Sequence, residues 1–425
     1  MSNSSYGSDS EEKGEEFRGK ILIGQKGKYL LIDKIGHGAF SSVWLCFNTS
    51  DKKYYAIKIQ NPEDYFDGKD ELRILKKCLL LKDNNIIKLL DDFIISKKNI
   101  KKVKEKKGSS YIYKNKIVYK KYICMVLPLM GYNIYNLLKM NKSGLDNKLI
   151  KNIIISIVES LIELLKSYQI CHTDLKPENI LININNSKYQ KLIDKYNNYN
   201  ILDICEKQIN GITNNNKKKK AKAKILKKLH IKILSKMDLL YENNSYTNSN
   251  SNSNSEYSYK YSISDSDSEV NNIDINDIKK NDIKLSDFGT AIKTKYLDND
   301  IIQTRYYRAP EVILRNKYNE SIDVWSIGCI LYELYTGKVL FNPEKDSETT
   351  TDQQHLHLIS KYFGKIPKRM LKKNIYPKVR QIDFSEIFPK DKQNQDLIDL
   401  IKKCCVINPN DRIKLSEILN HNFLV

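Results

Sequence analysis

The stretch "ICHTDLKPENILI", Ile170–Ile182, places three polar side chains of complementary chemistry within six residues. Asp174 can accept the proton of an attacking hydroxyl group, and Lys176 can steady a transferring phosphate. Asn179 can bind a magnesium ion together with Asp287 of the later "DFG", because hard cations prefer oxygen ligands. Each residue alone could be an ordinary surface residue, but their order and spacing predict a phosphoryl-transfer site.

A glycine-rich turn precedes this stretch. In "GHGAFSSVW" the residues Gly36 and Gly38 would let backbone amides approach a phosphate, although a plain hairpin turn explains them equally well. Ser41 replaces the third glycine of the G-x-G-x-x-G pattern. A dinucleotide-binding fold needs a helix directly after the glycines, whereas "SSVWLCF" reads as a strand.

A lysine follows on the next predicted strand. Lys58 in "YYAIKIQ" lies where it could reach the α- and β-phosphates of a nucleotide. Glu71, on the following predicted helix, is the candidate partner for its ammonium group. Glu63 is the alternative, and it precedes the helical pattern.

These motifs together resemble those of eukaryotic protein kinases. "AIK", "HTDLKPEN", "DFG", "YYRAPEVI", "DVWSIGCILYEL" and "NPNDRI" occur in the family's order, from about Tyr29 to the end of the chain. The resemblance implies an α+β, bilobal fold with a small β-rich N-lobe and a larger helical C-lobe. It also implies that ATP and Mg²⁺ are the cofactors, with transfer to serine or threonine because of Lys176.

The resemblance assigns roles to further residues. The adenine would lie against Leu127–Gly131, and the expected ATP contacts are Ile35, Gly36, Gly38, Val43, Ala56, Lys58, Glu71, Leu127 and Met130. On the substrate side, Thr304 would bond near Asp174 and Lys176, while Arg305 and Arg308 would shape the floor. His172, Asp323 and a Glu311–Arg412 brace would be structural.

The motifs also resemble one kinase group in particular. "HTDLKPENIL" is typical of the SR-protein kinases and the LAMMER kinases, and the late segment "DQQHLHLISKYFGKIPKRM" lacks the LAMMER motif. The SR-protein kinases act on Arg/Ser-rich splicing factors, so we expect such proteins as substrates. Gln353, Gln354 and Lys361 occupy part of the helix where that family carries docking acids, which predicts a weaker or differently placed acidic groove. A LAMMER-like or other CMGC kinase with different site preference is the alternative.

Thr173 lies where most kinases have an arginine that binds an activation-loop phosphate. A buried arginine needs an anion, and its replacement removes that need. The sequence therefore predicts activity without activation-loop phosphorylation. A pseudokinase scaffold is the rival from another class, and the intact Lys58, Asp174, Asn179 and Asp287 disfavour it.

Composition divides the chain into five parts. We expect a flexible tail over 1–20, an N-lobe over 21–130, C-lobe parts over 131–184 and 282–425, and a disordered spacer over 185–281. A lysine-dense segment within the N-lobe, 96–121, reads as a loop or long hairpin, and 223–241 reads as one helix within the spacer. Other strands and helices follow the periods of two and 3.6 residues.

The remaining composition bounds the setting. The net charge is +21, and the lysines concentrate in the two low-complexity segments, so RNA contact is a secondary hypothesis. The eight cysteines have neither zinc-site nor disulfide spacing, which indicates a reducing compartment. No apolar run suits a signal peptide or a bilayer span, so we expect no membrane association. We also expect a monomer, located in cytoplasm and nucleus.

Overall fold

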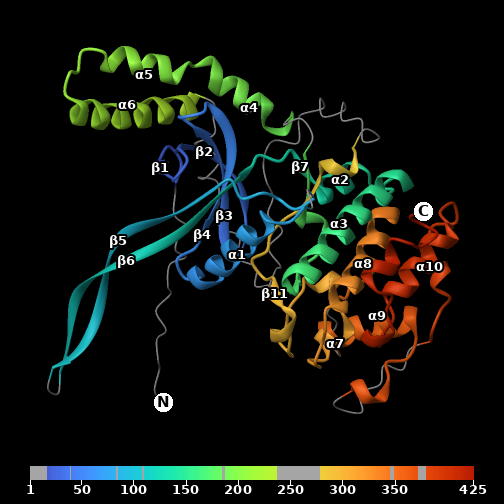
Figure 1. Ribbon diagram of the computed structural model, residues 1–425. Coiled ribbons are helices and arrows are strands. Elements are labelled where there is room, and N and C mark those ends of the chain that lie inside the picture. The colour runs from blue at the N-terminus through green and yellow to red at the C-terminus, as the bar shows by residue number, and fades with distance from the viewer. Residues whose placement is uncertain are drawn as a thin grey trace, which may run out of the picture. The chain divides into compact units, whose positions relative to one another are not determined.

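The computed structural model describes residues 17–38, 40–82, 85–107, 110–183, 187–236, 278–344, 349–371 and 380–425. These residues form two compact units, each with its own core. The first unit contains a six-stranded sheet, and the second is mainly helical (Figure 1). This architecture confirms the predicted kinase fold class, with a β-rich part and a larger helical part.

The sheet of the first unit has the strand order β1-β2-β3-β4-β6-β5. Its strands are β1 (Ile21–Ile23), β2 (Lys28–His37), β3 (Ser41–Asn48), β4 (Lys53–Gln60), β5 (Asp91–Lys107) and β6 (Ser110–Pro128). β-Branched and aromatic residues dominate the central strands, as suits a packed sheet. Trp44, Leu45 and Ile57 are at most 1 % exposed and form the centre of this core.

Residues 17–20 differ from the predicted flexible tail. Phe17 is 2 % exposed and its ring contacts those of Trp44 and Tyr122 edge-on. Arg18 forms an ion pair with Asp33 at 2.5 Å. One aromatic anchor and one ion pair thus order these four residues, while the rest of the predicted tail lies outside the described residues.

The lysine-dense segment 96–121 belongs to a long antiparallel hairpin, which was one of its two predicted forms. β5 and β6 pair continuously from Asp91–Val126 to Lys107–Ser110. Lysines occupy both odd and even positions of this segment, so the alternation of polar and apolar residues that predicts a strand is weak. The hairpin is therefore evident from the strand pairing and not from the sequence pattern.

Three helices lie where the sequence analysis expects a disordered spacer. They are α4 (Ser187–Asn198), α5 (Ile201–Ile209) and α6 (Asn215–Lys236). Of the predicted helix over 223–241, residues 223–236 lie in α6, and 237–241 fall outside the described residues. Apolar residues at helical spacing explain the difference, because Ile193, Tyr196, Cys205, Ile209 and Leu226 are all at most 6 % exposed. The predicted disorder over 237–277 falls outside the described residues.

The second unit is built around α8 (Ser321–Thr336), whose residues from Ile322 to Thr336 are all buried. Its other long helices are α1 (Tyr65–Cys78), α3 (Asn147–Tyr168), α9 (Thr351–Phe363) and α10 (Gln395–Cys404). Shorter ones are α2 (Ile134–Met140), α7 (Pro310–Ile313) and α11 (Leu415–Ile418). None of the described helices is both long and apolar enough to cross a membrane.

Short paired strands in the second unit flank the HTDLKPEN and DFG motifs. β9 (Ile180–Ile182) lies between β7 (Tyr132–Asn133) and β10 (Ile283–Leu285), and β8 (Ile170–Cys171) pairs with β11 (Ile292–Lys293). The hairpin-like pairing of β9 with β10 brings together segments that lie about 100 residues apart in the chain. It fixes the spacing between the HTDLKPEN and DFG motifs.

The segment 63–90, predicted as part of the N-lobe, groups with the helical unit by its contacts. Tyr168 donates a hydrogen bond to the carbonyl oxygen of Lys77 at 3.1 Å, and Lys82 donates its amide to Glu163 at 2.9 Å. Leu285 pairs with the backbone around Ile86. These long-range bonds, which sequence spacing cannot reveal, explain the difference.

Candidate active site

The loop after β8 is fastened to the central helix α8. Asp323 accepts hydrogen bonds from the amides of His172 at 2.8 Å and of Thr173 at 2.9 Å. The His172 ring is fully buried, with Nε2 3.0 Å from the carbonyl oxygen of Ser286 and Nδ1 accepting from the amide of Asp174. The loop is therefore rigid where it presents Asp174.

Burial raises the pKa of Asp323, and the electrostatic effect of His172 and the hydrogen bonds from the two backbone amides oppose that rise. Those amides occupy both carboxylate oxygens. The left-handed backbone of Thr173, with φ of 66°, follows from the same anchorage, because a β-branched residue adopts that conformation only when its surroundings enforce it.

Asp174, Lys176 and Thr304 form one hydrogen-bonded cluster. The Lys176 ammonium lies 2.7 Å from Asp174 Oδ2 and 3.0 Å from Thr304 Oγ1. Thr304 donates both its amide, at 3.0 Å, and its hydroxyl, at 2.7 Å, to Asp174 Oδ1. The predicted proximity of Thr304 to the other two residues is therefore present. The carboxylate is oriented as a proton acceptor beside a fixed positive charge.

Asn179 is oriented toward this cluster by its amide nitrogen. Nδ2 donates to the backbone oxygen of Asp174 at 2.8 Å and more weakly to its Oδ2 at 3.3 Å. Because the nitrogen is engaged there, Oδ1 points away from Asp174. Ser286, next to Asp287, donates its amide and hydroxyl to the Asn179 carbonyl oxygen at 2.9 Å. The DFG segment and the loop are thus tied together at Asn179.

The oxygen donors in this region fit a hard divalent cation. Asp287 is exposed and has a left-handed φ of 63°, a strained conformation often found at functional sites. Its carboxylate and the Asn179 amide oxygen are the ligand types that Mg²⁺ takes. Asn179 and Ser286, the neighbour of Asp287, are joined by backbone hydrogen bonds. The chemistry of this pair of side chains therefore fits a magnesium ion.

The first unit contributes a row of residues across three strands. In the sheet register Gly36 faces Val43, and Val43 faces Lys58. Directly paired residues share a face of the sheet, and Ala56, two residues from Lys58, shares it as well. A methyl group built on Gly36 would lie 3.0 Å from the Val43 side chain, so glycine lets these two strands approach. These four predicted ATP contacts therefore share one face of the sheet, and the half-buried Ile35 lies on β2 beside Gly36.

Gly38 also lies on the first unit, whereas three further predicted nucleotide contacts lie on the second unit. Glu71 is 2 % exposed on α1, and Leu127 and Met130 flank the short turn before β7. Lys58, itself 9 % exposed, belongs to the other unit. The predicted pairing of Lys58 with Glu71 remains a prediction.

The two arginines predicted to shape the substrate floor bind different partners. Arg308 donates to the carbonyl oxygens of Ile302 and Gln303, with its shortest contact at 2.8 Å. Arg305 forms an ion pair with Asp352 of α9 at 2.6 Å. Burial, followed by the charge of Arg305, lowers the pKa of Arg308. Arg308 therefore fixes the backbone, whereas Arg305 links the loop to α9.

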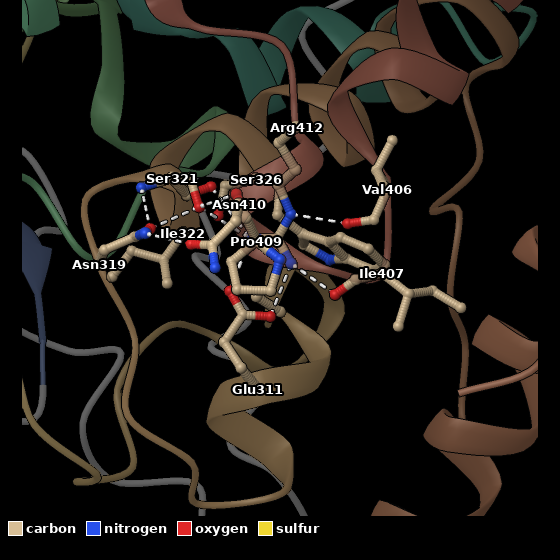
Figure 2. Close-up of polar contacts among 12 residues, drawn as sticks. Glu311, Asn319, Ser321, Ile322, Ser326, Val406, Ile407, Pro409, Asn410 and Arg412 are labelled. Atoms are coloured by element: carbon tan, nitrogen blue, oxygen red, sulfur yellow. Dashed lines mark hydrogen bonds and ion pairs between the residues drawn. The ribbon is translucent and has the colours of Figure 1, made fainter. Parts of the chain in front are cut away.

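The predicted brace between Glu311 and Arg412 is present and fully buried. Both guanidinium nitrogens lie 2.6 Å from the two carboxylate oxygens, and the side chains are 1 % and 0 % exposed. Figure 2 shows that Arg412 also contacts the carbonyl oxygens of Val406 and Ile407 and the Ser321 region. The brace joins the segment after Thr304 to the C-terminal helices.

Comparison with known proteins follows this geometry. The protein kinase domain model matches residues 29–195 and 201–424. The chain belongs to the protein kinase family. It is 27 % identical to the serine/threonine-protein kinase SRPK of Physarum polycephalum, over 86 % of this chain and 75 % of the relative. It is 25 % identical to SRSF protein kinase 3 of Mus musculus, over 85 % and 78 % of the respective chains.

Other relatives confirm the CMGC resemblance and the fold. The human dual specificity protein kinase CLK4 is 24 % identical, over 94 % of this kinase and 66 % of the relative. A solved crystal structure of a kinase domain superposes with a TM-score of 0.57 at 24 % identity, covering 95 % of this kinase and 97 % of that chain. That similarity supports the fold alone.

The sequence analysis missed an acidic pair in the kinase's second unit. Glu178, inside the opening motif, has a buried Oε2 without a hydrogen-bond partner among the described residues. Burial raises its pKa, and a hydrogen bond from its own backbone, followed by the charge of Lys176, opposes that rise. Glu333 of α8 accepts the Tyr307 hydroxyl at 2.7 Å, and burial with the Glu178 charge raises the pKa of Glu333 to about 7, although the Tyr307 bond opposes this.

The motifs gave no indication that Glu178 and Glu333, which are 155 positions apart, influence each other. Glu178 lies within the quoted "KPEN" and Glu333 within "LYEL", so both letters were visible. Their mutual effect on pKa depends on the fold, which brings the loop against α8. The available signal was the presence of two acids, Asp323 and Glu333, in a mostly apolar helix, because ionisable residues rarely occupy buried positions without a reason.

Proposed function

We propose that this kinase transfers the γ-phosphate of ATP to serine or threonine in proteins. The observation that carries the proposal is the cluster of Asp174, Lys176 and Thr304, with Asn179 tied to it. A substrate hydroxyl at Asp174 would find an oriented carboxylate to accept its proton. Lys176 would neutralise charge on the transferring group, and Thr304 would keep both side chains in position.

Bound ATP with Mg²⁺ would supply the phosphoryl group and its charge neutralisation. Asn179 and Asp287 are the residues we assign to the metal, because their oxygens suit a hard cation. On the first unit, the face with Val43, Ala56 and Lys58 is assigned to the nucleotide. The glycine turn at Gly36 and Gly38 is assigned to the phosphates; a methyl group built on Gly38 would have no neighbour closer than 4.0 Å.

We infer that the substrates are arginine-rich, as the names SRPK and SRSF protein kinase of the relatives suggest. The late helix α9 offers few acids for this purpose. Gln353 and Gln354 bond to Thr350 and Thr349 at the helix start, and Asp352 already pairs with Arg305.

The acidic pair Glu178 and Glu333 is the better candidate for binding a substrate arginine. One buried carboxylate oxygen of Glu178 lacks a hydrogen bond among the described residues, and a guanidinium would satisfy it. Glu178 lies two residues after Lys176, and its charge raises the pKa of Glu333 on α8. The pKa values of Glu178 and Glu333 are both raised, which indicates that ionising both carboxyl groups is unfavourable unless a cation binds beside them.

We further propose that activity needs no phosphate on the activation segment. Thr173 is fully buried and donates its hydroxyl to the carbonyl oxygen of Thr290 at 2.7 Å. β11 pairs with β8 through Ile292 and Cys171, and the Thr294 amide donates to the Gln169 carbonyl oxygen. These neutral contacts order the start of the segment where other kinases use an arginine and a phosphate.

A peptide kinase assay tests the function and its specificity together. Kinase made in bacteria with a co-expressed phosphatase, and shown by mass spectrometry to be phosphate-free, would be offered Arg-Ser, Ser-Pro and acid-flanked peptides. We expect the Arg-Ser peptide to be phosphorylated with the highest kcat/KM. Equal use of all three peptides would contradict the substrate assignment, and activity only after phosphorylation by an upstream kinase would contradict phosphate independence.

Inactive variants separate the enzyme from a scaffold. Asp174→Asn and Lys58→Met should each lower kcat by a factor of about 10² to 10⁴, the usual contribution of a general base or a comparable group. Circular dichroism would establish that each variant is folded. If wild-type kinase and Asp174→Asn gave the same slow phosphorylation, the chain would be a pseudokinase scaffold instead.

A further inference from the structure

Helix α6 carries a lysine-rich surface that the kinase activity does not use. Ten of its 22 residues are lysine, and its sequence contains neither aspartate nor glutamate. Lys217, Lys220, Lys224 and Lys228 are all exposed. At 3.6 residues per turn these four fall within an arc of about 80° and span about 16 Å of helix. We call these four residues the lysine stripe.

The opposite side of α6 packs against α5. Leu226 is 2 % exposed, and Cys205 of α5 donates its thiol to the carbonyl oxygen of Lys222 at 3.7 Å. Lys222, also on this side, forms an ion pair with Glu206 of α5. Figure 1 shows α5 and α6 running side by side. Packing to α5 thus uses one side of the helix and leaves the lysine stripe facing away.

The lysine stripe is unfavourable for the helix that carries it. Lysines three or four positions apart repel each other, by about 0.2–0.5 kcal/mol per pair on an exposed helix. Lys217 also lies in the first turn, where the helix dipole disfavours a cation. Within the described residues, no ion pair engages any of the four, whereas Lys222 has Glu206. Among the described residues of the first unit, no ion pair therefore neutralises the lysine stripe.

We propose that the lysine stripe is a docking surface for the phosphate backbone of single-stranded RNA. Successive lysines of the stripe lie about 5–6 Å apart, as helical geometry dictates. A flexible single strand can bring consecutive phosphates to this straight row. The stripe has no aromatic residue for stacking on bases, so the contact is independent of base sequence.

The surface fits an anionic membrane less well. Membrane-bound helices place an apolar face in the lipid next to their lysines. In α6 the fully buried Leu226 is turned to α5, and the stripe itself is lysine throughout. The proposal is independent of ATP and of the kinase's protein substrates, so its test needs neither.

The proposal is tested by fluorescence anisotropy with a labelled uridine oligonucleotide. A length of about 20 nucleotides is more than enough to span the lysine stripe. The variant replaces all four stripe lysines by glutamine, a good helix former, so α6 should persist. A matched control replaces Lys148, Lys166, Lys390 and Lys402, which are exposed on the second unit, by glutamine. Both variants change the net charge equally.

We expect the stripe variant to bind at least about tenfold more weakly at low salt, and the control to bind as the wild type does. The slope of log affinity against log salt should become shallower by about 3 in the stripe variant, since four phosphate contacts on a single strand contribute about 0.7 each. Unchanged kinase activity on peptide would show that the variant is folded.

Three outcomes would overturn the proposal. A control variant that weakens binding as much as the stripe variant does would overturn it, because equal losses indicate diffuse attraction by net charge. A poly-glutamate peptide or phosphatidylserine vesicles bound more tightly than the oligonucleotide, with the same dependence on the stripe, would assign the surface to another partner. A deoxythymidine oligonucleotide that binds more tightly than the uridine one would assign it to DNA.

Discussion

The hydroxyl of Thr173 donates to the carbonyl oxygen of Thr290 at 2.7 Å, joining the catalytic loop to the residue after the DFG motif. The Thr173 amide donates to Asp323 at 2.9 Å, so both hydrogen-bond donors of this residue are engaged. The threonine is therefore held by the Asp323 side chain and the Thr290 carbonyl oxygen, without a phosphate. This explains how the loop can be ordered without the arginine–phosphate pair of other kinases.

Thr173→Val should weaken that anchorage. The substitution nearly preserves shape but removes the hydrogen bond to the carbonyl oxygen of the exposed Thr290, which should cost about 0.5–1.5 kcal/mol. We expect a lower thermal midpoint and a lower kcat on peptide, while Thr173→Ser, which keeps the hydroxyl, stays close to wild type. Differential scanning fluorimetry and steady-state kinetics measure both effects. If the valine variant were indistinguishable from wild type, the hydrogen bond between Thr173 and Thr290 would not contribute to stability or activity.

The buried pair of Glu311 and Arg412 predicts strong non-additivity. Removing one partner by Arg412→Met or Glu311→Leu leaves an unpaired buried charge, and each should lower the free energy of unfolding by about 3–5 kcal/mol. The double variant should lose much less than the sum, because two apolar side chains can replace the pair. Urea denaturation of the four proteins gives the coupling energy. Additive losses would mean that the two side chains act separately.

The sequence predicted the catalytic loop well because its chemistry is local. Asp174, Lys176 and Asn179 lie within six residues, and only Thr304 and Asp323 had to come from elsewhere. The insert was less predictable. Its apolar residues Tyr196 and Cys205 are diluted by asparagine and lysine, and their burial depends on partners such as Phe47 and Leu226. Composition measures average polarity, whereas folding needs only a few apolar residues on one face.

The acidic pair was hidden for a different reason. Glu178 and Glu333 become a pair only when the loop packs against α8, and no periodicity links residues so far apart. The role of Glu71 illustrates the converse, since the motif predicts its pairing with Lys58 while the two residues belong to different units. Local chemistry is therefore easier to predict than proximity set by tertiary packing.

The acidic pair predicts a pH-dependent preference for arginine. Glu333 has a pKa of about 7, so it is ionised above that pH and attracts a substrate cation there. The KM for an Arg-Ser peptide should rise as the pH falls from about 8 to about 6, whereas a peptide with alanine for the arginine should show little change. A bound guanidinium would lower the pKa of Glu333 and move this transition to lower pH.

Glutamine variants test the same assignment. Glu333→Gln cannot ionise, so its KM should be insensitive to pH in this range and about tenfold higher at pH 8, the effect of losing one charge-assisted bond. Glu178→Gln should also raise KM for the arginine peptide. Peptide kinetics across the pH series measure both. If the pH dependence of KM were the same for the arginine and alanine peptides, the pair would not be the arginine site.

His355 of α9 predicts an acid-sensitive stability. The ring is fully buried against Phe341, and neither nitrogen has a hydrogen-bond partner among the described residues. Burial, followed by the charges of Arg305 and Arg308, lowers the pKa of His355 to about 3. The native state therefore keeps this histidine neutral between about pH 3 and pH 6.5, where the unfolded chain binds a proton.

Because the unfolded state binds more protons in that range, the free energy of unfolding should fall as the pH drops below 6.5. At pH 5 this one group should account for about 2 kcal/mol of lost stability, at about 1.4 kcal/mol per pH unit. His355→Leu, similar in volume and unable to titrate, should lose less stability between pH 7 and pH 5. Urea denaturation at both pH values measures the difference, and His357→Leu, on the same helix with no such burial, is the matched control. Equal acid sensitivity of wild type and His355→Leu would show that other groups dominate.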